Sequence, residues 1–211
     1  TYRLQVSSFS DFMYYYEKNY ITETLPTVKY TFNDVELFEK TWYWRVQPQD
    51  TSTGPWSNTY TFTVDTTPPA NVHNLSVKTP PPPFTENGQI EFTWTTPGDD
   101  GTVGRITDGK FIIRYTTTAA IITESDWQNA TNYAFGGEAI FPLTASPGVK
   151  MYTSVRGLQT GTTYYFAIKV QDTAGNVSPI SVNNPSGFTN AAPVVSLFYP
   201  TGSELLSKTA E

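Results

Sequence analysis

Apolar and polar residues alternate along much of this chain. Two eleven-residue segments, 41–51 and 163–173, carry the same alternation of aromatic and branched residues, and both end in Gln-Asp-Thr. Successive side chains of a strand point to opposite faces, so the pattern predicts a strand with one buried face, used twice. The repeat indicates two similar β modules in tandem rather than one larger domain.

Turn-forming residues divide the rest of the chain into short strands. The segment 60–64 runs into Thr-Thr-Pro-Pro at 66–69, and prolines cannot continue a strand ladder, so we place a linker at 66–71. No segment shows sustained helical periodicity. Beyond the linker we expect strands at 72–77, 89–95, 110–116, near Tyr133, and at 150–155, 163–171 and 187–189. That number of strands between 70 and 190 predicts an immunoglobulin-like sandwich.

The composition favours many short strands and excludes several classes of function. Aromatic residues make up 15% of the chain and charged residues 15%, with 16 Pro and 14 Gly. The formal net charge is −6 and the 13 basic residues are scattered, which disfavours nucleic-acid binding and an anionic membrane surface. There is no membrane-spanning apolar run. The lack of cysteine excludes disulfides, thiolate metal sites and a Cys nucleophile.

The segment 158–170, Leu-Gln-Thr-Gly-Thr-Thr-Tyr-Tyr-Phe-Ala-Ile-Lys-Val, resembles the E–F corner and F strand of fibronectin type III modules. The turn 172–178 resembles the F–G loop of bacterial examples. The resemblance covers 70–190 well and 1–65 in part. It implies an all-β fold of tandem immunoglobulin-like sandwiches, in which the hydroxyl of Tyr164 bonds upstream backbone. The implied core residues are Trp42, Trp44, Trp94, Leu158, Tyr164 and Phe166.

The first module departs from this pattern because its opening strands are missing. Residues 1–7 resemble the third strand of the family, so we expect 1–65 to form a module without its first two strands. We expect a complete module at 72–190, and at 191–211 the first strand of a further module or a strand-exchange tail. In the exchange alternative, 192–206 pairs with the open edge of another copy. The tail residues concerned are Val194, Val195, Leu197, Phe198 and Leu205.

Catalytic chemistry has little support in the sequence. His73 is the single histidine, and neither an orienting acid nor a Gly-x-Ser-x-Gly elbow accompanies it, so we expect it to be structural. Asp99 and Asp100 are adjacent and would point oppositely on a strand, which does not suit glycoside hydrolysis. We predict that the chain is not an enzyme.

Calcium is the one cofactor that the sequence suggests. Asp99, Asp100 and Asp108 fall in one glycine-rich loop between the second and third strands of the complete module. Hard oxygen ligands on such a loop suit Ca²⁺. The alternative, which we favour on sequence alone, is a tight turn with Asx hydrogen bonds.

An aromatic run near the N-terminus is a candidate ligand surface. It comprises Tyr14, Tyr15, Tyr16 and, nearby, Tyr20. Alternation along a strand directs at least one of these rings outward, where it would contact a sugar or a protein. An edge strand with tyrosine hydroxyls at its rim explains the same residues equally well.

The resemblance implies a non-catalytic structural or adhesive spacer module in a secreted or cell-surface bacterial protein. Its stiffness would come from the Thr-Pro linker. The alternatives are a carbohydrate-binding accessory module of an extracellular hydrolase, or a subunit of an extracellular filament assembled by strand complementation through 192–206. Expected partners are neighbouring modules, identical chains, and carbohydrate or a surface protein, without nucleic acid or membrane insertion.

Overall fold

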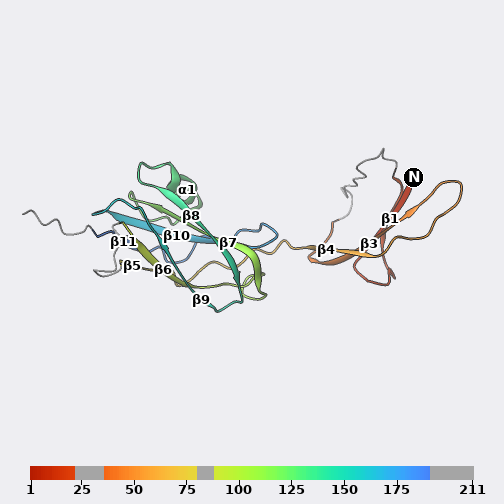
Figure 1. Ribbon diagram of the computed structural model, residues 1–211, viewed down its shortest axis with the longest axis horizontal. Coiled ribbons are helices and arrows are strands. Elements are labelled where there is room, and N and C mark those ends of the chain that lie inside the picture. The colour runs from red at the N-terminus through yellow and green to blue at the C-terminus, as the bar shows by residue number, and fades with distance from the viewer. Residues whose placement is uncertain (22–35, 80–87, 191–211) are drawn as a thin grey trace, which may run out of the picture.

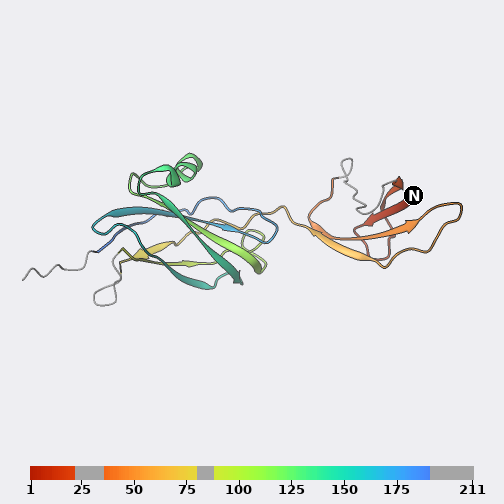
Figure 2. The same ribbon diagram turned by 45° about the horizontal axis from the view of Figure 1, so that its top comes forward.

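The computed structural model describes residues 1–21, 36–79 and 88–190. Two groups of strands lie at opposite ends of an elongated molecule, and the linker that follows β4 joins them (Figures 1 and 2). Every sheet is antiparallel, which confirms the predicted all-β fold class. The residues expected to form a strand-exchange tail lie outside the described part of the chain.

The N-terminal module contains one four-stranded sheet in the order β2-β1-β3-β4. Its strands are β1 (Tyr2–Ser7), β2 (Tyr16–Ile21), β3 (Lys40–Pro48) and β4 (Tyr60–Val64). The register pairs Leu4 with Val46 and Val6 with Trp44, so even-numbered residues share one face. That face is apolar. Leu4, Val6 and Trp42 are buried, whereas Trp44, Val46, Phe62 and Val64 are half-buried.

The C-terminal module is a sandwich of two sheets, β11-β10-β7-β8 and β5-β6-β9. Its strands are β5 (Ser76–Lys78), β6 (Ile90–Thr95), β7 (Ile106–Thr116), β8 (Gly137–Ala145), β9 (Lys150–Val155), β10 (Thr163–Gln171) and β11 (Ser186–Phe188). Aromatic rings interlock between the sheets: the ring centroids of Phe92 and Phe166 are 4.8 Å apart, and those of Trp94 and Phe111 are 4.6 Å apart. The edge-to-face geometry is a favourable one for aromatic pairs.

Both modules contain a four-stranded sheet with the same strand order, since β4-β3-β1-β2 and β11-β10-β7-β8 correspond strand by strand. The repeated segments form β3 and β10, which occupy equivalent places. At the corner before β10, the Tyr164 hydroxyl accepts a hydrogen bond of 3.0 Å from the backbone N–H of Gln159. Tyr164 is buried and lies in the core with Leu158.

A short helical insertion joins β7 to β8 and was not predicted. Helix α1 (Glu124–Asn129) leads into a 3-10 turn, η1 (Ala130–Asn132). Thr123 caps α1, and Asp126 completes a capping box with it. The prediction of a strand near Tyr133 is wrong, since Tyr133 follows η1 and the strand begins at Gly137. One and a half helical turns are too short to show a periodicity in the sequence. Within the described residues, no helix has the length and apolar character needed to span a membrane.

Trp127 attaches α1 to the outer face of the β10-β7 sheet. Its ring lies against the side chains of Arg114 and Lys169, with the Arg114 guanidinium carbon 4.9 Å and the Lys169 Nζ 5.0 Å from the ring centroid. Lys169 is buried and donates to Glu124 at 2.6 Å. The helix therefore covers a face that carries two cations.

Candidate functional site

The linker between the modules is hydrogen-bonded to the second module. Pro69 and Gly101 form a parallel bridge, in which Gly101 N–H donates to Pro68 O at 3.1 Å and Ala70 N–H donates to Gly101 O at 2.9 Å. Gly101 has φ +63°, a left-handed conformation that glycine adopts without strain. The turn after β6 therefore holds the linker along its backbone.

Asn176 connects the end of the first module to the turn after β10. Its Nδ2 donates to the backbone oxygen and to Oδ1 of Asp65, at 3.2 and 3.1 Å, and to Oδ2 of Asp172 at 3.0 Å. Asp172 is only 4% exposed. Its Oδ1 accepts the backbone N–H groups of Gly175 and Asn176, both at 2.8 Å, which closes the turn.

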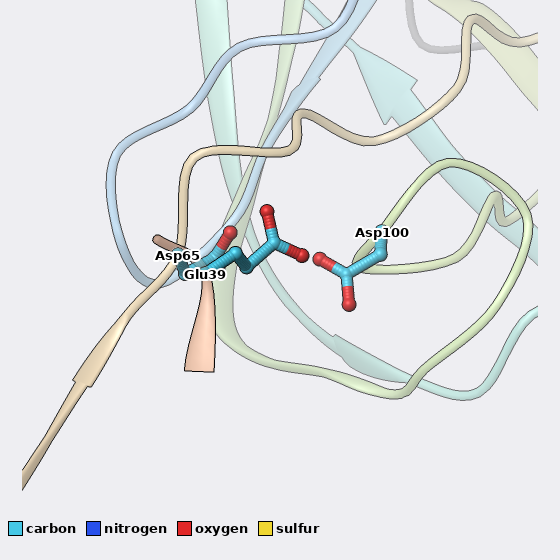
Figure 3. Close-up of side chains that lie close together, drawn as sticks. All are labelled: Glu39, Asp65 and Asp100. Atoms are coloured by element: carbon cyan, nitrogen blue, oxygen red, sulfur yellow. The ribbon is translucent and has the colours of Figure 1, made fainter. Parts of the chain in front are cut away.

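Carboxylates from distant parts of the chain meet at this junction. One oxygen from each of Asp65, Asp99 and Asp172 lies within 4.8 Å of the other two. Asp65 forms a second such group with Glu39 and Asp100, and Figure 3 shows the carboxylates of Glu39 and Asp100 pointing toward one another. We call these five residues the junction carboxylates. Glu39 and Asp65 lie next to β3 and β4 of the first module, whereas Asp99, Asp100 and Asp172 belong to the second module.

Burial and mutual repulsion change the acidity of this cluster. Desolvation first, and then the charge of Asp172, raise the pKa of Asp65 and the pKa of Asp99. The pKa of Glu39 is lowered instead, chiefly because the Thr67 hydroxyl donates to its carboxylate. Oδ1 of Asp99 is buried and has no hydrogen-bond partner. The negative charges are therefore only partly compensated within the described structure.

The structure separates the three aspartates that the sequence suggested for calcium. Asp99 and Asp100 lie in the turn after β6, at the junction. Asp108 lies on β7 with φ +53°, not in that turn, and its backbone N–H donates to Thr144 Oγ1 at 3.1 Å. Asp108 belongs to neither group of carboxylates found among the described residues.

Sequence reasoning missed Glu39, Asp65 and Asp172 because they are far from Asp99 along the chain. Two signals were present. Asp172 belongs to the repeated Gln-Asp-Thr, and Asp65 is the residue between the last strand of the first module and its linker. The equivalent residue of the first repeat, Asp50, is exposed and belongs to neither group.

A second candidate site is an aromatic cavity of about 190 Å³ in the N-terminal module. Its lining includes Tyr14, Tyr15, Tyr16, Phe38 and Trp42. Tyr14 is 70% exposed and Tyr15 46%, so their rings are accessible. Tyr16 begins β2, whereas the two preceding tyrosines lie in the loop before it. Tyr20 is on β2, and its side chain lies outside the described part of the structure.

His73 is exposed in the loop before β5. It lines a shallow pocket of about 320 Å³ with Asn74 and Thr95. Asn74 Nδ2 donates to Thr95 Oγ1 at 2.8 Å, and Thr95 N–H donates to Asn74 Oδ1 at 2.9 Å. These amide and hydroxyl groups are therefore engaged with one another, and the lining of the pocket contains no carboxylate.

Comparison with solved structures shows the class of fold. The chain is similar to a crystal structure of the chicken CNTN1 FN1-FN3 domains, with a TM-score of 0.52 and 16% identity over 90% of this chain and 56% of that chain. A structure of three successive titin domains gives a TM-score of 0.42 and 13% identity over 89% of this chain and 54% of that one. No protein-family model and no curated protein matches the sequence. The fold is that of tandem fibronectin type III-like sandwiches.

Proposed function

We propose that this chain is a spacer segment of a secreted or cell-surface multidomain protein, of the bacterial kind indicated by its F–G loop. Its sandwiches hold other parts of that protein apart or join it to neighbours. The observation that carries this proposal is the hydrogen-bonded linker, in which Pro68 and Ala70 are bonded to Gly101. A spacer needs a defined angle between modules, and a linker bound to one module supplies it.

The physical basis is a reduced number of linker conformations. Pro68 and Pro69 each have φ restricted to about −65°. The bonds to Gly101 restrict the neighbouring torsions, and the Asn176 contact to Asp65 ties the last strand of the first module to the second. The mechanism of the spacer is therefore geometric and needs no bound substrate.

Distance measurement between paired spin labels tests this proposal. The chain has no cysteine, so Thr61→Cys in β4 and Tyr152→Cys in β9, both exposed, place one label in each module. We expect a narrow distance distribution that broadens when Pro68 and Pro69 are both replaced by glycine. Pro55→Gly, in the exposed loop between β3 and β4 at the far end of these strands from the linker, is the matched control. A wild-type distribution as broad as that of the double-glycine variant contradicts the proposal.

Carbohydrate binding is a second candidate function, favoured by the aromatic cavity. Exposed Tyr14 and Tyr15 offer ring faces to the apolar face of a sugar and hydroxyls to its polar edge. Retention on polysaccharide affinity gels tests it. Tyr14→Ala and Tyr15→Ala are expected to abolish retention, whereas Tyr152→Ala, an exposed tyrosine of the other module, leaves it unchanged. Equal retention of all variants contradicts this function.

A filament subunit is favoured by one feature, the half-buried apolar face that carries Trp44, Val46 and Phe62. A strand layer from an identical chain would bury this face further. Light scattering behind a size-exclusion column, on the full chain and on a version ending at Thr189, tests it. Polymers of the full chain with monomers of the shortened one support assembly through 192–206, and two monomeric species contradict it.

A further inference from the structure

We propose that the junction between the two modules binds a calcium ion through Asp65, Asp99 and Asp172, and that this ion couples the orientation of the modules. The ion binding itself is independent of the spacer role. The coupling rests on that role, because a fixed angle matters only if the chain acts as a spacer.

The spacing of the oxygens fits a single ion. Calcium takes six to eight oxygen ligands at about 2.3–2.6 Å, so any two oxygens on one ion lie at most about 5 Å apart. One oxygen from each of Asp65, Asp99 and Asp172 meets this limit, since all lie within 4.8 Å of one another. The three carboxylates therefore lie close enough to share one ion.

A buried and unsatisfied oxygen points independently to a ligand. Oδ1 of Asp99 is shielded from solvent and accepts no hydrogen bond. Buried carboxylate oxygens in folded proteins are nearly always paired, because leaving one unpaired costs its lost hydration. A cation bound by the Asp99 carboxylate would compensate this oxygen. Crowding of acids alone would not produce such an atom, since exposed carboxylates keep their water.

Further oxygens surround the three aspartates. Glu39 and Asp100 lie within 4.8 Å of an oxygen of Asp65 and supply additional carboxylates. Asn176 contacts both Asp65 and Asp172 through its Nδ2. Rotation of that amide by half a turn exchanges Nδ2 for Oδ1, which is a neutral calcium ligand. With bound water, these groups suffice for the usual coordination number.

The local charge favours a divalent cation. Four other carboxylates approach Asp65: those of Asp99 and Asp172 in one group, and those of Glu39 and Asp100 in the other. The ion pairs recorded within 1–21, 36–79 and 88–190 involve none of the junction carboxylates. Calcium suits this site better than magnesium because its coordination geometry is flexible, whereas magnesium requires a near-ideal octahedron.

The bound ion would join elements of both modules. Asp65 directly follows β4 of the first module, whereas Asp99 follows β6 and Asp172 follows β10 of the second. The backbone bonds at Gly101 hold only the linker. An ion shared by the three aspartates adds a bridge from the first module itself.

Calorimetric titration of the full chain with calcium chloride near neutral pH tests the binding. We expect one ion per chain, and at least tenfold weaker binding in Asp65→Asn and in Asp99→Asn. Asp50→Asn is the matched control, because Asp50 is the exposed equivalent of Asp172 in the first repeat, and its binding should equal that of the wild type. These near-isosteric changes preserve the fold, which circular dichroism verifies. No binding at millimolar calcium, or wild-type affinity in Asp65→Asn, overturns the site.

The labelled pair at 61 and 152 tests the coupling and separates the two proposals. We expect calcium to narrow the distance distribution in the wild type but not in Asp65→Asn. Calcium binding without narrowing overturns the coupling. A narrow distribution that is independent of calcium, in a chain that binds none, overturns this inference and leaves the spacer proposal supported. A broad distribution that calcium narrows supports the inference and shows that the linker alone does not set the angle.

Discussion

The two modules carry the same four-stranded sheet but differ in what covers it. In the second module the inner face of that sheet packs against β5-β6-β9, and Phe166 on β10 is fully buried. Its equivalent on β3, Trp44, is half-buried and stacks on Tyr60 with ring centroids 5.0 Å apart. The two sheets share one strand order, but the burial of equivalent residues depends on the layer that packs against each sheet.

The outer faces of the two sheets differ in a complementary way. In the second module an aromatic ring, Trp127, contacts two cations, Arg114 and Lys169. In the first module a cation, Arg45, contacts two rings, with its guanidinium carbon 4.0 Å from the centroid of Phe12 and 4.4 Å from that of Trp56. Arg45 also donates twice to Gln5 Oε1, at 2.9 and 2.8 Å. Both arrangements cover charged or polar positions with aromatic surface.

The largest expected effect on stability comes from truncating residues on the inner faces of the two sheets. Phe166→Ala should lower the free energy of unfolding of the second module by about 3–5 kcal/mol, because it leaves a cavity between two sheets. Trp44→Ala should cost about 1–2 kcal/mol, because part of its ring already contacts water. Urea denaturation followed by circular dichroism measures both. Equal costs would show that both faces are covered to the same degree.

The next effect concerns the outer faces. Trp127→Ala should lower the unfolding free energy by about 3 kcal/mol and release α1, since it removes the buried ring that contacts Arg114 and Lys169. Arg45→Ala should cost about 1–2 kcal/mol, the range for a desolvated cation–π contact. Thermal unfolding shows which of the two variants loses more stability. A larger loss for Arg45→Ala would show that the first module depends more on its outer face.

A smaller effect is expected from removing the N-terminal cap of α1, which leaves the packing of Trp127 in place. Thr123→Ala should cost about 1 kcal/mol, because the Thr123 hydroxyl accepts the N–H of Asp126 at the start of α1. Thr118→Ala, also in the connection between β7 and β8, is the control. Hydrogen exchange of the α1 amides measures the loss, and it should leave β7 and β10 protected. Exchange that increases throughout the sandwich would contradict a local role for the cap.

The smallest expected effect is on the pKa values at two contrasting sites, the junction carboxylates and the pair of Glu124 and Lys169. Asp65 and Asp99 should titrate above their ordinary pKa of 3.8, whereas Glu124, paired with Lys169, should titrate below its ordinary 4.5. The two aspartates then contribute stability that is present below their ordinary pKa and is lost as pH rises through the raised value. Glu124 contributes the reverse, stability that is lost as pH falls through its lowered pKa. Carbon-detected NMR of the carboxyl groups measures all three, and a lowered pKa of Asp65 in calcium-free buffer would contradict the expected repulsion.

Much of the fold was predictable because the alternation typical of a strand is visible within a short segment. The segments 60–64, 150–155 and 163–171 coincide with β4, β9 and β10. The helix between β7 and β8 was not predictable, since its one buried aromatic, Trp127, makes no period in six residues. Of the candidate metal ligands, Asp99 and Asp100 were named from their turn, while Asp108 was grouped with them only by proximity in sequence.

The alternation of side chains along short segments was enough to predict an all-β chain of repeated modules, because strand periodicity depends only on neighbouring residues. The meeting of Asp65, Asp99 and Asp172 depends on the folded arrangement, since the three residues follow strands that are far apart in sequence, β4, β6 and β10. The same holds for the different burial of Trp44 and Phe166. Contacts between distant segments arise from packing and backbone hydrogen bonds, and no local pattern encodes their distances.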